Sequence, residues 1–227
     1  MDLLPTSEQD EIIESVRSVL ADRHTIGEPV SDALWNTAVE QGWFALSASE
    51  ADGGVGYSIV EEALLFAEIG AACAPGPFLA TGDVASKAHV LIASSLAGIA
   101  RATTEQSVSY GKDREQFGQP IGGFQAVKHR CADMSVRADA ALNQSRFAAL
   151  AVRDGRGDAA FHAGAAHLVA INAALANTHW NIQNHGGIGF TWEHTAHRFL
   201  TRARVWSQLA GGLRGAEAAT LEAAAPE

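Results

Sequence analysis

The feature that most constrains this chain is a series of long segments, from about residue 84 onward, that contain no proline. The first, from about Val84 to Lys112, contains no proline, and a helix of that length would extend roughly 40 Å. Two more follow with only the glycine turn at Gly155 to Gly157 between them, and the last of these ends near His185. Helices of this length bury their apolar stripes by lying side by side, so the segments predict an up-and-down bundle.

The two later segments carry periodic stripes that indicate which side faces the core. Steps of four and three residues place on one face of the earlier segment Val127, Cys131, Met134, Ala138, Ala141, Ser145, Ala148 and Val152. In the later segment, which Asp158 can cap, the same spacing selects Phe161, Ala165, Leu168, Asn172, Leu175, His179 and Ile182. We expect Asn172 and His179 to be buried and to hydrogen-bond across the bundle. A last amphipathic helix is expected from Trp192 to about Leu209, before an alanine-rich tail from Glu217 to Glu227 that should fray.

Shorter helices are predicted before residue 80 from their capping signals. Thr6 with Gln9, and Ser58 with Glu61, have the capping-box spacing, and Ser31 can cap a helix between them. No stretch shows the alternation that a sheet requires. The expected fold is therefore all-α, with residues 1–80 as an N-terminal helical domain, residues 81–227 as a C-terminal four-helix-bundle domain, and no β-domain.

The charge balance limits the partners of the chain. Sixteen Lys and Arg against 26 Asp and Glu give a net charge of −10, which repels nucleic acids and anionic membranes, so neither is an expected partner. Cys73 and Cys131 cannot form a disulfide framework, and Cys131 lies on an apolar stripe as a small core residue. We expect no bilayer span and no export leader, and hence a cytoplasmic protein.

Two helix junctions contain residues suited to binding phosphate. The first has Arg114, Phe117, a Gly-x-Pro turn and Gln125; the second has Gln183 followed by Gly186 and Gly187. Arginine offers a bidentate fork to a pyrophosphate, and paired glycines let a ligand approach the backbone amides. The structural alternative is a charge that compensates a helix dipole and an ordinary helix stop, and geometry alone favours it.

Together these segments resemble the C-terminal helical domain of the acyl-CoA dehydrogenase family. The resemblance rests on Tyr110, Arg114, Gln116-Phe117-Gly118, Pro120-Ile121, Phe124-Gln125, Ala132-Asp133-Met134, Gln183, His185-Gly186-Gly187, Gly189-Phe190-Thr191-Trp192-Glu193 and Arg202-Ala203. The first part is similar to the N-terminal domain of the family through Thr6, Trp35 to Trp43, Glu50 with Gly53, Gly54 and Gly56, and Pro75-Gly76-Pro77-Phe78.

The resemblance implies a function and a set of cofactor contacts. In this family a flavin accepts hydride from the β-carbon of an acyl-CoA thioester while a glutamate removes the α-proton. The positions that match FAD-contacting residues of the family are Arg114, Phe117, Gln125, Gln183, Gly186 and Gly187. In the family these positions touch a dinucleotide bound mainly by a neighbouring subunit, so the resemblance implies FAD shared across an interface.

Two departures from the family pattern qualify this expectation. The family carries a β-domain between its helical parts, but here Phe78 to Asp83 leads almost directly into the first long helix. The family's base falls on Ala210, or on Ala88 or His89, and an alanine methyl cannot accept a proton. His89 could act as a base near neutral pH, but a lone histidine on a helix is more often a surface or core residue.

Two further patterns on the last helix have ordinary structural explanations. Glu193, His194 and His197 resemble a metal-binding spacing but lack a third ligand, and no metal is expected. Arg198, Arg202 and Arg204 lie on one helix and could meet phosphates, although such charges are usually solvated or ion-paired.

The sequence therefore indicates an accessory subunit of an unequal acyl-CoA dehydrogenase complex, without a catalytic residue of its own. A longer acyl-CoA dehydrogenase subunit, or a second copy, would supply the β-domain, and the acyl-CoA substrate is expected to be a steroid-CoA. One alternative is a self-sufficient homomeric dehydrogenase with an unrecognised base. Another is a non-catalytic helical scaffold that does not bind flavin. The sequence also leaves open whether the missing middle domain is natural or has been removed.

Overall fold

The first part of the chain forms three short helices whose ends follow the capping signals. The computed structural model describes residues 3–75 and 85–223. Within them α1 spans Ser7–Arg23, α2 Asp32–Glu40 and α3 Ile59–Ala71, with a 3-10 turn η1 at Glu50–Asp52. Both expected capping boxes are formed, and Ser31 caps α2 through a bond from the Leu34 N–H. Gly42 follows α2 in the left-handed conformation.

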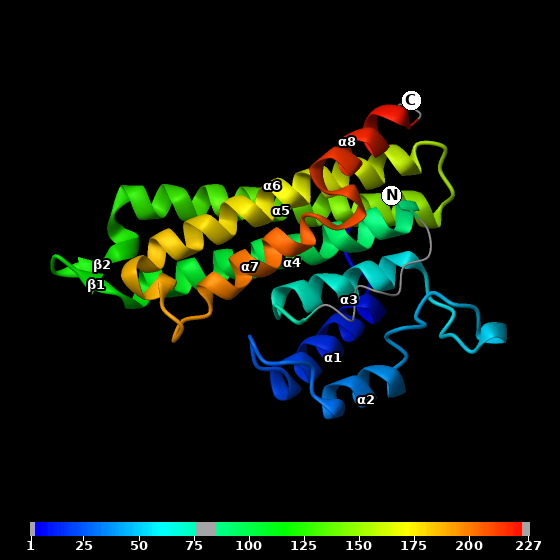
Figure 1. Ribbon diagram of the computed structural model, residues 1–227, viewed down its shortest axis with the longest axis horizontal. Helices are drawn as coiled ribbons and strands as arrows, with labels where there is room; N and C mark the ends of the chain where they lie inside the picture. Colours follow the sequence, from blue (N-terminus) through cyan, green and yellow to red (C-terminus); the bar gives the residue numbers. More distant parts are fainter. Residues whose placement is uncertain (1–2, 76–84, 224–227) are drawn as a thin grey trace.

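Three long antiparallel helices form the bundle. They are α4, Ala85–Asp113, α5, Gln125–Arg153, and α6, Ala159–His185. A two-stranded hairpin, β1 at Glu115–Gln116 and β2 at Gln119–Pro120, projects from the end where α4 leads through η3, Ile121–Gly123, into α5 (Figure 1). Then follow η4, Gly186–Phe190, α7, Ala196–Trp206, η5, Leu209–Gly211, and α8, Gly212–Glu222. The expected all-α fold is confirmed, with the hairpin as a small addition.

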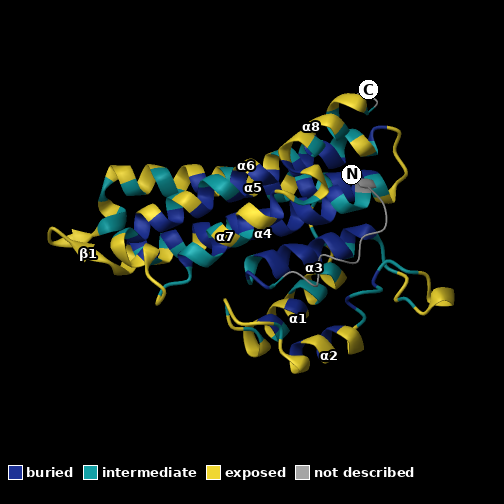
Figure 2. Cartoon of the chain, in the orientation of Figure 1, coloured by how far each residue is buried: buried dark blue, intermediate teal, exposed yellow. Residues whose placement is uncertain are grey.

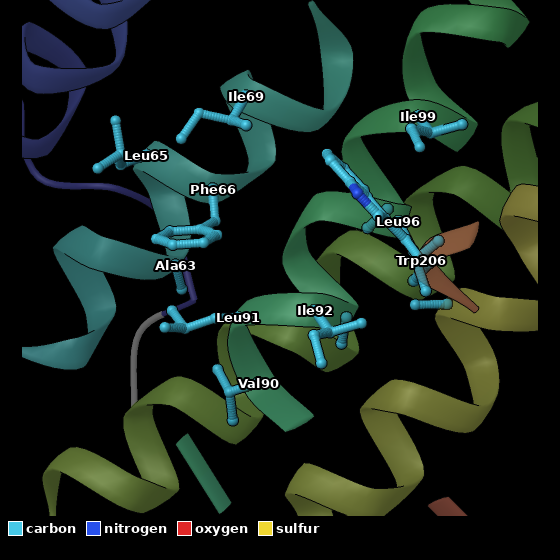
Figure 3. Packing of buried hydrophobic residues seen from close by; sticks show 14 of the residues in the cluster. Ala63, Leu65, Phe66, Ile69, Val90, Leu91, Ile92, Leu96, Ile99 and Trp206 are labelled. Atoms are coloured by element: carbon cyan, nitrogen blue, oxygen red, sulfur yellow. The ribbon is translucent and has the colours of Figure 1, made fainter. Parts of the chain in front are cut away.

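A continuous apolar cluster joins the first part of the chain to the bundle. It contains Leu34 of α2, Phe66 of α3, Leu96 of α4 and Trp206 of α7, all nearly fully buried. Figure 3 shows the last three of these side chains. The helices are blue on their inner sides and yellow on their outer ones in Figure 2. Many core residues of α5 and α6 are alanines, which lets these helices lie close to one another. The boundary expected near residue 80 stays a prediction, and the motif from Gly76 to Phe78 lies outside the described residues.

The stripe predicted for α5 is largely confirmed, but the one predicted for α6 is wrong. Asn172 is exposed and bonds to the Leu168 carbonyl of its own helix, and His179 is also exposed. The buried polar residues of α6 are instead Asn177, Asn181 and Asn184 together with His167, Thr178 and His185. Alanine residues of α6 lie on several of its faces. The apolar periodicity of the sequence therefore did not distinguish the buried face from the exposed ones. Cys131, expected in the core, is only half-buried.

The C-terminal helices also differ from expectation. The helix predicted from Trp192 to about Leu209 is observed as the shorter α7, which begins at Ala196 and ends at Trp206. It is followed by η5, where Ala210 has a positive φ of 49°. The segment expected to fray is helical as far as Glu222 and contacts α6. By length and composition alone Ala159–Phe190 could cross a membrane, a criterion that the core helix of a folded domain also meets. Contacts with α4, α5, α7 and α8 account for this composition, because α6 is the central helix of the bundle.

A buried pair of histidines lies between α4 and α6. The Nδ1 atoms of His89 and His167 are 2.8 Å apart, and both side chains are buried. Only one proton can occupy this hydrogen bond, so adding a second would bring two N–H groups face to face. Burial lowers the pKa of both rings, and burial together with His89 lowers the pKa of His167 to about 4.

This pair should make the protein acid-sensitive. An unfolded histidine has a pKa of about 6.5, so between there and about 4 the unfolded chain binds more protons than the folded one. We expect the free energy of unfolding to decrease as the pH falls through this window, by on the order of 2 kcal/mol for this pair. Urea titrations across the window measure the slope. His167→Gln keeps a hydrogen-bonding group without the titration and should reduce the slope, with the remainder due to His24, His185 and His194, whose pKa values burial also lowers. An unchanged slope would contradict the assignment.

Candidate functional site

The junction between α4 and α5 exposes the first group of predicted site residues. Arg114 follows α4 directly, with its N–H bonded to the Tyr110 carbonyl and its own carbonyl accepting from Ile121. Phe117 lies at the hairpin tip with a positive φ of 54°, and its side chain is 93% exposed. Gln125 is the first residue of α5 and is exposed. The junction between α4 and α5 therefore presents a guanidinium, an aromatic ring and an amide to solvent.

The end of α6 carries the second group. Gln183 is exposed in its last turn, and the helix stops at Gly186, where φ is 65° and ψ is −141°. This conformation is essentially restricted to glycine. A Cβ atom added at Gly186 or Gly187 would meet nothing within 4 Å. The backbone of this turn is thus open to approach from outside.

Interactions across the bundle bring both groups to one end of the molecule. The ring of Tyr110 in α4 stacks on His185 at the end of α6, with centroids 4.3 Å apart. Arg130 in α5 donates to Asn184 Oδ1 at 2.9 Å and covers the ring of Trp180. These contacts hold the ends of α4 and α6 beside the start of α5, and Figure 1 shows the hairpin and the end of α6 at the same end of the bundle.

A ladder of buried amides stabilises this end and was not identified from the sequence. The Asn177 side chain donates to the Met134 carbonyl at 2.8 Å and to Thr104 Oγ1 at 3.1 Å, and so joins α4, α5 and α6. One turn later, Asn181 accepts from Ser107 at 2.8 Å. The signal available in the sequence was the spacing of Asn177, Asn181 and Asn184 at steps of four and three.

The exposed polar groups at this end suit an anionic ligand. The side chains of Arg114, Gln125 and Gln183 form no hydrogen bond or ion pair within the part of the chain that the structure describes. A guanidinium can bind phosphate oxygens in bidentate fashion, and the two amides can donate without adding charge. The residues present therefore fit the phosphates of a dinucleotide, although their assignment as its ligands stays a prediction.

The three positions that match the family's catalytic base carry no carboxylate. Ala210 is exposed in η5, which contacts α4, and Ala88 is half-buried in the first turn of α4. His89 is paired with His167 and only 8% exposed, so its ring is poorly placed to reach a substrate proton. The buried carboxylate near this turn belongs to Glu62, which forms an ion pair with Lys87 at 2.8 Å.

The histidine-rich turn before α7 shows no metal-binding geometry. His194 lies against His185 with ring centroids 4.2 Å apart, and His197 lies edge-on to Trp192. Burial, followed by His185 and His197, lowers the pKa of His194. Within residues 3–75 and 85–223, no three side chains of the metal-ligating types converge on one point.

Comparison with known families gives two matches that together extend over most of the chain. Residues 86–214 match the C-terminal domain of acyl-CoA dehydrogenase, and residues 6–106 match its N-terminal domain. Acyl-CoA dehydrogenase FadE34 of Mycobacterium tuberculosis is 47% identical over 126 residues, which are 55% of this chain and 18% of that protein. The chain spans less than half the length of the curated relatives that it matches.

Solved structures show the same fold at low sequence identity. The ChsE4-ChsE5 complex from Mycobacterium tuberculosis superposes with a TM-score of 0.85 at 16% identity, covering 96% of this chain and 97% of that chain. The Tcur3481-Tcur3483 steroid ACAD gives a TM-score of 0.84 at 18% identity, covering 95% and 97%. At these identities the likeness concerns the fold alone.

Proposed function

This chain belongs to the acyl-CoA dehydrogenase family, and on that premise we propose that it is an accessory subunit of an FAD-dependent acyl-CoA dehydrogenase complex. Its role is to contribute phosphate contacts to a flavin dinucleotide whose ring is held by a longer partner. The chemistry is α,β-desaturation of an acyl-CoA thioester, and the partner supplies the base. The complex works in the cytoplasm.

The observation that carries this proposal is the short connection between the two helical parts. The first part of the chain is described as far as Pro75, and α4 begins at Ala85. Only residues 76–84 therefore lie between the two helical parts. A β-domain that covers one face of an isoalloxazine ring needs a hydrophobic core of its own, for which a connection of this length is far too short. The chain by itself offers a phosphate-binding end without a cover for the ring.

The exposed end of the bundle supports a shared cofactor. When bound, FAD accepts the hydride; the residues of this chain act at a distance from that step. Arg114 neutralises phosphate charge, Gln125 and Gln183 donate amide hydrogens, and the turn at Gly186 and Gly187 lets the dinucleotide approach the backbone. Phe117, which is 93% exposed, extends the same surface.

The comparisons support a partner and a substrate class. Two structures with the same fold are named for two components each, and one of them is named a steroid ACAD. Exposed aromatic side chains are common where another protein docks, and Phe117 and Phe190 are 93% and 71% exposed at the bundle end. We therefore assign the chain to a hetero-oligomer acting on a bulky, steroid-type acyl-CoA.

Co-expression with a longer acyl-CoA dehydrogenase encoded nearby tests the proposal. The two chains should elute together in gel filtration as a yellow complex, and this chain expressed alone should be colourless. The partner expressed alone is the control for flavin that does not depend on this chain. A yellow homomer that oxidises acyl-CoA unaided would favour a self-sufficient enzyme, and a colourless chain that ignores every partner would favour a scaffold. Either result contradicts the proposal.

A further inference from the structure

A cleft lies between α7 and the first part of the chain, beside the turn that follows η4. Its volume is about 410 Å³, which is within the usual range for small-molecule sites. One face of α7 lines it with His197, Arg198, Thr201, Arg202 and Val205, and the opposite side is formed by Gly27, Cys73 and Trp192. Gly27 belongs to the connection between α1 and α2, and Cys73 follows α3, so three separate segments build the cleft.

The charge in this cleft is entirely basic. Its lining includes Arg198 and Arg202 but no carboxylate. Within the described ranges neither guanidinium forms an ion pair, whereas Arg17, Arg101, Arg153 and Arg156 all do. In a protein with a net charge of −10, two uncompensated arginines side by side are an unfavourable arrangement unless an anion joins them.

The backbone and the thiol around these arginines are fitted to them. Gly27 has a positive φ of 97°, and a Cβ atom there would overlap the Arg198 guanidinium. Burial raises the pKa of Cys73 to about 11, against the opposing effect of a hydrogen bond and charge from Arg202 and of charge from Arg198. Both guanidinium groups therefore face a thiol that stays neutral, and the thiol cannot serve as their counter-ion.

The remaining lining combines the hydroxyl group of Thr201 with the aromatic rings of Trp192 and His197 and the apolar side chain of Val205. Trp192 is 81% exposed and Val205 is 56% exposed, which are unusually high fractions for such side chains. Trp192 lies edge-on to His197 with ring centroids 5.1 Å apart, and both ring nitrogens of His197 are buried without a hydrogen-bond partner among the residues that the structure describes. A ligand with a flat apolar body could cover this indole and valine surface.

We propose that this cleft binds a small organic anion, with its oxyanion held between Arg198 and Arg202 and its apolar body placed on Trp192 and Val205. The shared chemistry is a phosphate or carboxylate attached to a ring or chain, and the volume admits about one nucleotide or one fatty acid. The site is separate from the Arg114 surface, so it does not depend on the proposed function.

Calorimetric titration of the purified chain tests whether this site binds an anion and distinguishes a phosphate ligand from a carboxylate ligand. ADP with adenosine as its uncharged control represents the phosphates, and decanoate with 1-decanol represents the carboxylates. We expect one of the anions to bind at millimolar concentration or below, while its uncharged control does not. Arg198→Gln and Arg202→Gln should each weaken that binding about tenfold or more, because each removes one charge-assisted contact.

Control variants separate binding from folding. Arg204→Gln removes an exposed charge of α7 that does not line the cleft and should change affinity less than about twofold. Arg202→Lys keeps the charge without the fork and should give an intermediate loss. Gly27→Ala displaces Arg198 without removing it and should also weaken binding. Circular dichroism verifies that each variant is folded. The proposal is overturned if neither anion binds, or if binding survives both glutamine substitutions.

Discussion

Gly98→Ala is expected to lower the free energy of unfolding by about 1–2 kcal/mol, although alanine is the better helix former. A Cβ atom at Gly98 of α4 would overlap the Ala67 carbonyl of α3 and lie 2.9 Å from the Ala71 nitrogen. These are backbone atoms, so no rotamer change relieves the overlap and the two helices must separate. The cost of such overpacking is about 1–3 kcal/mol or more, and it exceeds the gain of about 1 kcal/mol in helix propensity.

A second close approach between α3 and α4 involves a glycine of α3. Gly70 of α3 lies against the Ser95 carbonyl of α4, where a Cβ atom would again overlap. Gly157→Ala is the matched control, because a Cβ atom there meets nothing within 4 Å. Urea denaturation of Gly98→Ala and Gly157→Ala measures the effect. If Gly98→Ala is as stable as Gly157→Ala, the close approach of α3 and α4 is not what joins the two parts of the chain.

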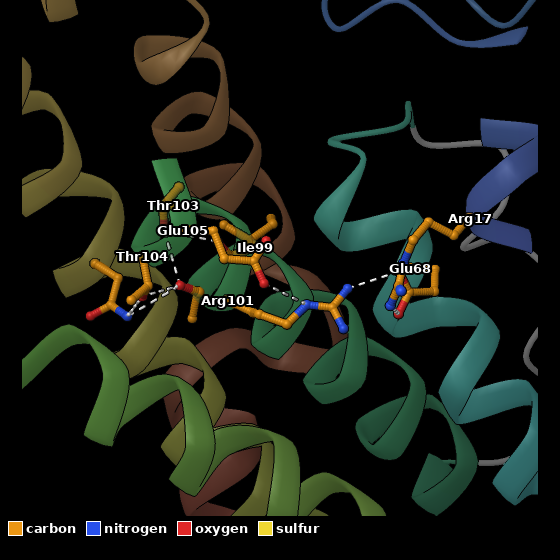
Figure 4. A network of polar contacts seen from close by, with 9 residues as sticks. Arg17, Glu68, Ile99, Arg101, Thr103, Thr104 and Glu105 are labelled. Carbon is orange, nitrogen blue, oxygen red and sulfur yellow. Dashed lines mark hydrogen bonds and ion pairs between the residues drawn. The ribbon is translucent and has the colours of Figure 1, made fainter. Parts of the chain in front are cut away.

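Glu68→Ala is expected to destabilise the fold by about 3 kcal/mol. Glu68 in α3 is 4% exposed and accepts from Arg101 of α4 at 2.8 Å and from Arg17 of α1 at 3.1 Å (Figure 4). Burial alone would raise its pKa, but the two guanidinium groups outweigh burial and hold the pKa below the usual value. Removing the carboxylate leaves Arg101, which is 23% exposed, with little compensation.

The exposure of Arg17 limits the loss of stability expected for Glu68→Ala, and Glu105→Ala provides its control. Arg17 is 56% exposed, so water screens it and its share of the loss is small. Glu105→Ala removes a carboxylate that is 70% exposed and 3.9 Å from Arg101, and should cost less than about 0.5 kcal/mol. Chemical denaturation at neutral pH compares the two. Equal losses from Glu68→Ala and Glu105→Ala would show that the buried network contributes no more than a surface pair.

The parts of the fold that followed from the sequence are those with local causes. Capping boxes at Thr6 and Ser58 depend on residues three positions apart, and they formed as expected. The first long helix, expected from Val84 to Lys112, is observed as Ala85–Asp113. The buried face of α6 has a nonlocal cause, because Asn177 is buried only where Thr104 and Met134 of other helices supply acceptors. Sequence periodicity contains no record of those partners.

The sequence predicted the residues of the candidate site more readily than it predicted their function. Its residues came from two junction motifs, and the structure places both junctions at one end of the bundle. Their assignment to a flavin came from family resemblance, which residue chemistry alone did not favour over an ordinary helix stop. The basic cleft was less visible, because Arg198 and Arg202 attract attention only once Gly27 and Cys73, distant in sequence, are seen beside them. Charged residues on a helix are ordinarily paired, and only the structure shows these two without a carboxylate.

The most direct test of the central claim is the dissociation constant of FAD from the assembled complex. With Arg114→Gln in this chain, we expect FAD to bind about 10–100 times more weakly, because a charge-assisted phosphate contact is lost. Arg153→Gln, a substitution of the same type at the opposite end of α5, should leave the constant unchanged. Fluorescence titration of the apo-complex with FAD gives both values. Equal affinity in the Arg114→Gln complex and the wild type would contradict a flavin shared across the interface.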